Sequence, residues 1–189
     1  MTIGDTSTFA IESEITRAFA RPSWRGLGFF VIHVAGRSYG IKAPGQSMLA
    51  CTVDEVGTRI AGRSTHQAPF AEAAAIDIAN AYTNAVYRDN NGNETYFGLS
   101  EAQFTKTLYS NSLVWAPDGD EAFDDGSVIM QFDDNKTVRL IAFTIKDKQK
   151  DIYNTVSDAW INADDFYGVL GEWKIKFEKL VSNCNVLNN

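Results

Sequence analysis

The chain has 189 residues, of which 44% are hydrophobic and 12% aromatic, and its formal net charge is −7. A chain of this length and apolar content can bury a core of ordinary size, and we expect a single domain over residues 1–189. The charge is unevenly spread, since residues 1–99 sum to −1 and residues 100–189 to −6. An acidic surface repels nucleic acid and anionic membranes, so those partners are disfavoured and a basic partner is favoured.

The cysteines and the N-terminus indicate the compartment. Cys51 and Cys184 lie far apart and next to neither histidine, which excludes the usual zinc spacings and favours free thiols. The first residues lack the basic and apolar regions of a secretory signal, and no stretch of about 20 apolar residues could span a bilayer. We therefore expect a cytoplasmic protein that does not bind membranes.

The first elements along the chain are predicted to be strands. Phe9, Ile11 and Ile15 lie on one side of an extended chain, which is typical of a strand. The apolar run over residues 27–34 and the segment 38–41 flank a short turn. This pattern predicts a β-hairpin.

Two helices are predicted to follow. Ser47 can cap the first, which ends near Gly62 and has an apolar stripe at helical spacing: Leu49, Val53, Val56 and Ile60. Pro69 suits the first turn of a longer helix that ends before residue 89 and has a second stripe: Phe70, Ala74, Ile78, Tyr82 and Ala85.

A third helix has the clearest local signal in the chain. Ser100 and Gln103 form a capping box, and Leu99 can contact Phe104 as a hydrophobic staple. The sequence therefore predicts a short helix that starts at this box and ends near Tyr109.

The last part of the chain predicts a hairpin, a strand and a terminal helix. A hairpin is predicted in which Val128, Met130 and Phe132 pair, across the four-residue polar loop 133–136, with Val138, Leu140 and Ala142 on the same apolar face. Its second face is mostly apolar too, so we expect both faces to be covered. A strand over residues 156–161 precedes a helix that Asn162 can cap and whose stripe is Phe166, Val169, Leu170, Trp173, Phe177 and Leu180.

These predicted strands and helices are segregated along the chain rather than strictly alternating. Such an order favours an α+β fold, in which hairpins build an antiparallel sheet and the helices pack against it. A doubly wound parallel sheet would need strict alternation.

The most informative charged feature lies between Lys106 and Lys136, where no positive side chain occurs. The second half of that gap holds seven carboxylates: Asp118, Asp120, Glu121, Asp124, Asp125, Asp133 and Asp134. Uncompensated charge of this kind indicates a docking surface, a metal site or a solvated loop. We call residues 118–125 the acidic segment. It continues into the predicted strand at 128–132, so part of it is anchored to folded structure.

Aromatic residues flank the acidic segment. Trp115 precedes it and Phe123 lies within it. An aromatic anchor ringed by charge is typical of an interface hot spot. The alternative is that both rings lie in the core beneath the loop.

A metal site is the second possibility for these acids. Starting an EF-hand at Asp118 places Phe123 at the sixth position, where glycine is required, and starting at Asp89 places Glu94 there. Both registers fail. An irregular cation site and a simple solvated loop remain open alternatives, and no cofactor motif is present.

Catalytic constellations are poorly supported. His33 lies in an apolar run and His66 has no neighbouring nucleophile, so a Ser-His or Cys-His arrangement is not indicated. Residues 26–28 begin like a dinucleotide fingerprint, but strand rather than helix follows. Glu12 and Glu14 lie on one face of a strand and could act as an acid/base pair, although most such pairs face solvent.

Three parts of the chain resemble the immunity protein 42 family. They are residues 3–12, residues 121–127 with 138–143, and Asp165-Phe166-Tyr167 with Leu170 and Trp173. The resemblance implies a protein encoded beside a bacterial polymorphic or contact-dependent toxin, which neutralises that toxin by binding it. It implies no catalytic residues. In the first of these parts, Gly4, Asp5 and Phe9 are more naturally determinants of the fold than of binding.

The resemblance gives the acidic segment a partner. Many such toxins are nucleases with basic, anion-binding active sites, which an acidic inhibitor can cover. We therefore expect a cognate toxin domain that is basic, such as a nuclease. The predicted partner-binding residues are Trp115, Asp118, Asp120, Glu121, Phe123, Asp124 and Asp125.

Three alternatives stay open. The loop at residues 89–94 could contact the partner instead. The chain could be a small carboxylate-dependent or metal-dependent enzyme that uses Glu12 and Glu14, or a generic interaction scaffold. The sequence does not indicate the oligomeric state.

Overall fold

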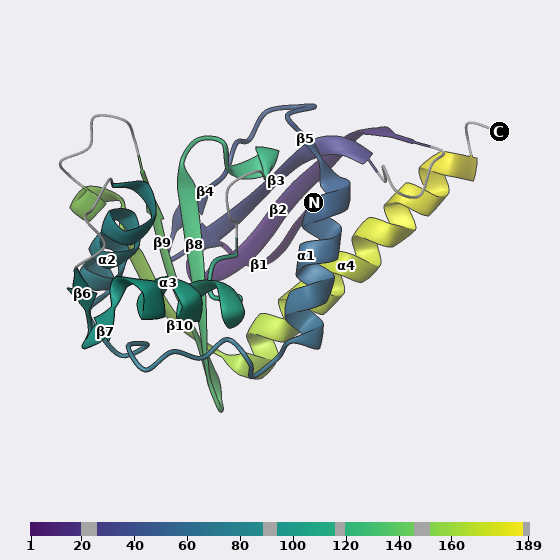
Figure 1. The fold of residues 1–189 in the computed structure, drawn as a ribbon. Coiled ribbons are helices and arrows are strands. Elements are labelled where there is room, and N and C mark those ends of the chain that lie inside the picture. Colours follow the sequence, from purple (N-terminus) through teal and green to yellow (C-terminus); the bar gives the residue numbers. More distant parts are fainter. Residues whose placement is uncertain (20–25, 89–93, 116–119, 146–151, 187–189) are drawn as a thin grey trace.

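A computed structural model describes residues 1–19, 26–88, 94–115, 120–145 and 152–186, with side chains described as far as residue 183. It is an α+β fold of antiparallel sheets and helices, which confirms the predicted fold class (Figure 1). The helices are α1 (Leu49–Ala61), α2 (Ala75–Tyr87), α3 (Glu101–Ser110) and α4 (Ala163–Val186), with short 3-10 turns η1 (Glu121–Phe123) and η2 (Ile152–Thr155).

The N-terminal sheet has the order β1-β2-β3-β4, and β5 pairs with β3 as well. All of its pairings are antiparallel. Its strands are β1 (Thr2–Asp5), β2 (Phe9–Ala18), β3 (Gly26–Val34), β4 (Arg37–Tyr39) and β5 (Ser47–Met48). The predicted hairpin over residues 27–34 and 38–41 is thus confirmed as β3 and β4.

The second sheet has the order β10-β9-β8 and is also antiparallel. Its strands are β8 (Ser127–Asp134), β9 (Thr137–Thr144) and β10 (Ser157–Asn162), and a separate small hairpin joins β6 (Thr95–Tyr96) to β7 (Leu99–Ser100). We call this sheet the C-terminal sheet. The β8–β9 hairpin is confirmed, but its predicted register was wrong, because Asp133 and Asp134 continue β8 instead of forming the loop. Met130 is opposite Ile141, and Val128, Met130 and Phe132 therefore point to the other face of the sheet from Val138, Leu140 and Ala142.

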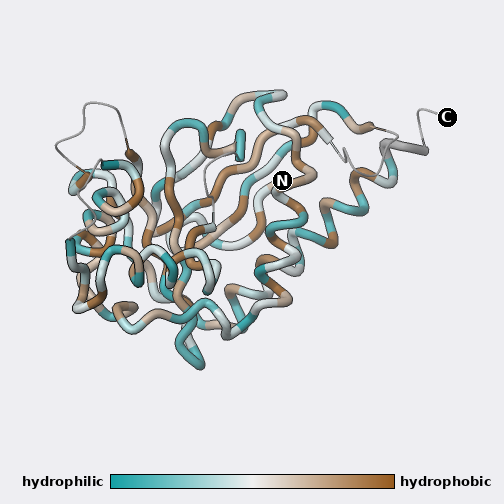
Figure 2. The backbone as a smooth tube through the Cα atoms, viewed as in Figure 1, coloured by the Kyte–Doolittle hydropathy of each residue, from teal (hydrophilic) through white to brown (hydrophobic). Residues whose placement is uncertain are grey.

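Two apolar cores lie on opposite faces of the C-terminal sheet. The first contains α1, α4 and the N-terminal sheet, with Leu140 of β9 pointing into it and Trp173 of α4 fully buried. The second contains α2 and α3, with Ile141 of β9 pointing into it. Figure 2 shows hydrophobic residues along the central strands and hydrophilic ones at the β8–β9 turn. The prediction that both faces of this hairpin are covered is confirmed.

Helix boundaries were predicted with mixed success. The Ser100 capping box is confirmed, since the Ser100 hydroxyl accepts from the Gln103 N–H and the Gln103 side chain accepts from the Ser100 N–H. Asn162 caps α4 by accepting from the Asp164 N–H at 2.8 Å. These caps depend on neighbouring residues only, which is why the sequence reveals them.

Two predicted helix starts were wrong. Ser47 does not cap α1, because it lies in β5 opposite Gly28 with its hydroxyl buried, and Met48 is the N-cap residue. The longer helix starts at Ala75 rather than at Pro69. The preceding carbonyls of Ala71 and Ala73 accept hydrogen bonds from the Arg139 guanidinium, which holds that segment in turns.

None of the described helices combines the length and apolar character that crossing a bilayer requires. The longest of them, α4, has charged side chains along its exposed side, among them Lys174, Lys176 and Glu178.

Candidate functional site

The described part of the acidic segment folds around η1, and its carboxylates bind backbone N–H groups. Asp120 accepts from the Ala122 N–H at 3.0 Å and so caps η1. Asp125 accepts from the Ser127 N–H at 3.0 Å, at the start of β8. Glu121 accepts from the Met48 N–H at 3.0 Å. The segment is therefore ordered by its own acids and tied to the start of α1, while Asp118 lies outside the described residues.

The fold adds a carboxylate from another element to these acids. Burial raises the pKa of the Asp120 carboxyl above its ordinary value, and the negative charges of Glu55, Glu121 and Asp124 raise it further. The bond from the Ala122 N–H acts in the opposite direction. Glu55 comes from α1, far away in the sequence. We call the group Glu55, Asp120, Glu121, Asp124 and Asp125 the acidic face.

The exposure of the acidic face differs from residue to residue. Glu121, Asp124 and Asp125 are exposed, whereas Glu55 and Asp120 are partly buried. The outer carboxylates can therefore be reached by a partner without any rearrangement. Behind them, Asp120 adds negative charge in a less polar environment where its field is less screened, whereas the charge of Glu55 is paired with the Arg59 guanidinium.

Trp115 and Phe123 lie in the core beneath the acidic face. Trp115 is 1% exposed and contacts Phe9 and Phe166, and Phe123 is 6% exposed and packs edge-on against Phe30. The second of the two placements considered from the sequence therefore applies, and in this conformation neither ring is an exposed anchor. Both rings fix the chain on which the acids are mounted.

The remaining two acids of the charged gap do not join this face. Asp133 is buried, and Asp134 is exposed at the β8–β9 turn. The six carboxylates of the charged gap that the structure describes are thus divided by the fold between a surface, a turn and the interior.

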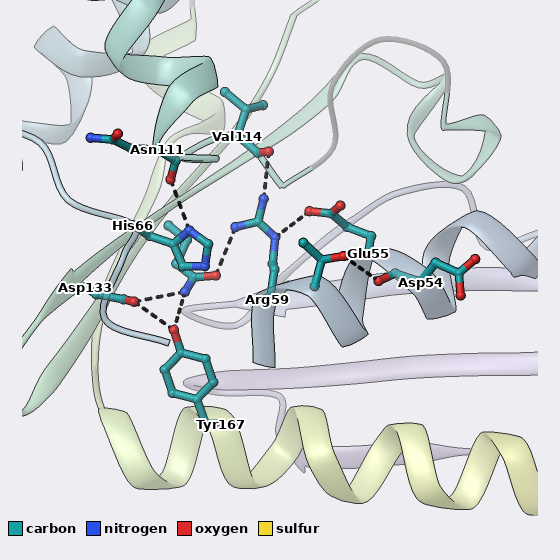
Figure 3. Close-up of polar contacts among 10 residues, drawn as sticks. Asp54, Glu55, Arg59, His66, Asn111, Val114, Asp133 and Tyr167 are labelled. Carbon is teal, nitrogen blue, oxygen red and sulfur yellow. Dashed lines mark hydrogen bonds and ion pairs between the residues drawn. The ribbon is translucent and has the colours of Figure 1, made fainter. Parts of the chain in front are cut away.

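A buried polar cluster lies behind the acidic face, centred on Arg59 of α1 (Figure 3). The guanidinium donates to the Gln131 side-chain oxygen at 3.1 Å and to the Val114 carbonyl at 2.7 Å, and it forms an ion pair with Glu55 at 2.8 Å. It also lies over the Trp115 ring, 4.9 Å from the centroid. Arg59 therefore connects the acidic face to β8 and to the core.

The cluster continues across β8 to α4. The Gln131 amide donates to Asp133 and to the Tyr167 hydroxyl, both at 2.9 Å, and that hydroxyl donates to Asp133 at 2.8 Å. Asp133 also accepts from the Ser64 N–H at 2.6 Å, and its own N–H donates to the His66 carbonyl. The fold thus supplies partners for the Gln131 amide, the Asp133 carboxylate and the Tyr167 hydroxyl, whereas the His66 Nε2 is buried without a hydrogen bond among the described residues.

The electrostatics of this cluster favour a fixed structure. Burial lowers the pKa of Arg59 to about 10, which still leaves it protonated at neutral pH. Burial, aided by Asp133, raises the pKa of Tyr167. Burial and the Arg59 charge lower the pKa of His66, whose Nδ1 lies 3.1 Å from the Asn111 carbonyl oxygen. We infer that the cluster holds α1, β8 and α4 together rather than exchanging protons.

Little in the sequence indicates this buried cluster. Gln131 and Asp133 occupy alternate positions of β8, on the same side as Ile129, although Asp133 was predicted to lie in the loop after the strand. A polar residue on the inward side of a strand is the one available signal that buried partners exist. The partners themselves come from α1 and α4 and cannot be read from β8.

Of the two carboxylates considered for catalysis, Glu12 is paired with basic side chains and Glu14 faces solvent. Glu12 is in contact with His33 at 3.1 Å and with Lys42 at 2.7 Å, and the bond from Lys42 is the main cause that lowers its pKa. Glu14 is exposed. Within the described ranges, no group of three or more His, Cys, Asp or Glu side chains is arranged to hold a metal ion.

The fold is similar to that of a solved immunity protein. The crystal structure of CdiI from Burkholderia dolosa AUO158 matches with a TM-score of 0.60 and 14% sequence identity, over 93% of this chain and 99% of that chain. At this identity the match shows a shared fold. No curated protein matches the chain significantly.

The family is shown by the sequence match. The model of the immunity protein 42 family matches residues 1–176, and the chain therefore belongs to that family. It is a toxin-neutralising immunity protein, and membership of such a family indicates a non-enzymatic role.

Proposed function

We propose that this immunity protein neutralises its toxin by stoichiometric binding through the acidic face, in the cytoplasm and without turnover of any substrate. The observation that carries the choice of surface is the gathering of carboxylates from α1 and η1 on one side of the molecule. Asp118, three residues before Glu121, would add to the same charge. The similarity to CdiI supports a toxin of the contact-dependent kind.

Asp120 supports a binding role for this face. Its carboxyl is partly buried beside other carboxylates, and those surroundings raise its pKa. The ionised form of Asp120 therefore lowers the stability of the folded protein. Ionisable groups kept in unfavourable surroundings are more frequent at functional sites than elsewhere. A cationic group of the partner would relieve this repulsion on binding.

A basic toxin surface is the matching partner. Clustered negative charge accelerates the encounter with a positive surface and positions it. A nuclease fits this description, because a nuclease site binds phosphates through positive groups. An acidic inhibitor that occupies such a site blocks the substrate directly, and no chemistry by the inhibitor is required.

Association with the toxin domain encoded by the adjacent gene should depend strongly on salt. Neutralising the acidic segment should slow association at low salt about tenfold to a hundredfold, because steering by charge contributes gains of that order. The measurement is stopped-flow association at low and high ionic strength, for the wild type and for a variant with four amides: Asp120→Asn, Glu121→Gln, Asp124→Asn and Asp125→Asn.

A matched control removes the same charge elsewhere. Its substitutions are at exposed acids outside the acidic face: Glu72→Gln, Asp77→Asn, Asp134→Asn and Glu178→Gln. It should associate at nearly the wild-type rate. Equal slowing of both variants would assign the effect to net charge, and a salt-independent wild-type rate would argue against this surface.

The variant Asp120→Asn should be more stable than the wild type at neutral pH. An amide oxygen can still accept from the Ala122 N–H, while the unfavourable charge is removed. Because the folded-state pKa of Asp120 is raised, its penalty is absent below the unfolded pKa of about 3.9 and develops as pH rises through the folded pKa.

Thermal unfolding at about pH 7 and about pH 3 measures this difference. The stabilisation should be present at the higher pH and nearly absent at the lower one. A variant that is less stable at neutral pH would show that the Asp120 charge serves the fold, and would remove this support for a binding role.

A further inference from the structure

The two edges of the C-terminal sheet differ in how they are covered. On the outer side of β8, the Trp115 N–H donates to the Ile129 carbonyl, the Gln131 N–H donates to the Leu113 carbonyl, and the Asp133 N–H donates to the His66 carbonyl. That edge is closed by other parts of the chain. β10 forms the opposite edge and pairs only with β9 among the described strands.

The outward-facing backbone groups of β10 follow from the register. In antiparallel sheets, successive residues direct their N–H and C=O alternately to the two sides. Since Ile129 and Gln131 bond outward from β8, the residues between them face β9, and Met130 is opposite Ile141. Alternate residues of β9 such as Leu140 then face β10.

Leu140 is opposite Ala159, so Ala159 directs its backbone groups to β9. Its neighbours Asp158 and Trp160 direct theirs to the outer edge. No described residue forms a hydrogen bond with the backbone N–H or C=O of either. These groups are available to an added strand.

The side chains leave this edge open and rigid. Exposed sheet edges are usually protected by Lys, Pro, a bulge or a covering segment. The sequence Ser-Asp-Ala-Trp-Ile-Asn of β10 has neither Lys nor Pro, and its pairing with β9 is continuous. Arg139 holds both Asp158 oxygens, at 2.9 and 2.7 Å, and lies over the Trp160 ring, which is nevertheless 47% exposed.

A cleft of about 350 Å³ runs beside the outer edge. Trp160, Ile161 and Asn162 line it from β10. Phe9 and Val169 give it apolar walls, and it also contains carboxylates from the end of β1 and from the first turn of α4: Asp5 and Asp165. Bonds from the Ser7 hydroxyl and N–H lower the pKa of Asp5, which keeps it ionised. Apolar walls together with two carboxylates suit the aliphatic stem and the cationic head of a Lys or Arg side chain.

We propose that the outer edge of β10 binds an extended segment of the toxin polypeptide, which pairs with the backbone of Asp158 and Trp160 and places a Lys or Arg in the cleft. This inference rests on the proposed function, since it names a second contact of the same partner. Backbone pairing supplies affinity and the cleft supplies selectivity. A second copy of this chain is a poorer occupant, because like charges at Asp5 and Asp165 would meet.

Amide hydrogen exchange by NMR tests the pairing in the wild-type complex. The amides of Asp158 and Trp160 should exchange at least about tenfold more slowly when the toxin domain is bound. The amides of Ala159 and Ile161 are the internal controls, since they already bond to β9. Unchanged rates at Asp158 and Trp160 in a complex that forms would overturn this inference and leave the proposed function intact.

Two further outcomes would also overturn the inference. Failure of the wild type to bind the toxin would overturn the proposed function, and this inference with it. Protection of the same two amides that rises with the concentration of this protein alone would assign the edge to a second copy and overturn the inference.

Substitutions at Trp160 distinguish the contribution of its backbone N–H to toxin binding from that of its ring. Trp160→Ala removes the ring only, whereas Trp160→Pro also removes an outward N–H and leaves the bonds to β9 in place. We expect the proline variant to bind the toxin about tenfold more weakly than the alanine variant. Thermal unfolding of both variants checks that each is folded. Equal affinities would count against backbone pairing, and the exchange experiment decides the matter if the proline variant does not fold.

Discussion

Replacing Arg59 by alanine should lower the free energy of unfolding by about 3–5 kcal/mol, because the change leaves buried partners of a charged group uncompensated. Arg59 is 0% exposed and is bound by Gln131, Val114 and Glu55, with Trp115 against its face. Its removal leaves the Val114 carbonyl without its guanidinium donor, in a space that water enters poorly. Urea unfolding monitored by tryptophan fluorescence measures the loss.

Arg63 provides the matched control for this experiment. It follows α1 closely, is 44% exposed, and pairs with Asp164, which is 82% exposed. An exposed pair of this kind contributes about 0–1 kcal/mol, and the guanidinium lies 5.0 Å from the centroid of the Tyr167 ring, a contact that contributes about 0.5–1 kcal/mol, so Arg63→Ala should cost less than about 2 kcal/mol. If both variants lost the same amount, the Arg59 cluster would not be the connection between α1, β8 and α4 that its hydrogen bonds indicate.

The same arginine has a consequence for the acidic face. The Arg59 guanidinium is the buried partner of Glu55, and Glu55 is one of the charges that act on Asp120. Loss of Arg59 would free Glu55 to change its rotamer and would alter the charge behind the exposed acids. Because the change removes a positive charge from behind the acidic face, a folded Arg59→Ala variant should associate with a basic toxin at low salt at least as fast as the wild type, which stopped-flow association measures.

Local patterns in the sequence were sufficient for most elements of the fold. The box of Ser100 and Gln103 and the cap at Asn162 involve residues a few positions apart, so the sequence contains the whole interaction. The β8–β9 hairpin was predicted from alternation, and the stripe on α4 from its period, with Phe166 and Trp173 buried as expected. Leu180, in the same predicted stripe, is exposed, and the neighbouring Val181 packs against the core instead.

The features that the sequence could not supply depend on distant partners. The start of α2 at Ala75 depends on Arg139 of β9, whose guanidinium donates to the Ala73 carbonyl just before the helix. The burial of Trp115 depends on Phe9 and Phe166, from the two ends of the chain. Charge along the sequence located the acidic segment, but only the fold shows that Glu55 lies beside it and that Asp133, from the same charged gap, is buried away from it.

Gly28, where β3 lies very close to the backbone of β2, is the second position at which a single substitution should strongly lower stability. A Cβ atom at Gly28 would lie 1.8 Å from the Glu14 carbonyl oxygen and 3.1 Å from a Leu49 methyl carbon. Gly28 is opposite Ile15 in β2 and also pairs with Ser47 of β5, so it has a neighbouring strand on each side. An added methyl group cannot be accommodated without separating β2 from β3.

We expect Gly28→Ala to lower the free energy of unfolding by about 3–4 kcal/mol, since the clash involves backbone and cannot be relieved by a rotamer change. Gly168→Ala is the control, because nothing lies within 4 Å of a Cβ there and alanine favours a helix by about 0.5–1 kcal/mol. Urea unfolding should thus give shifts of opposite sign. Glu121 of the acidic face accepts a hydrogen bond from the N–H of Met48, the last residue of β5. Displacement of β5 should therefore also weaken toxin neutralisation. A Gly28→Ala protein with wild-type stability would show that β2 and β3 can separate freely, contrary to the packing described above.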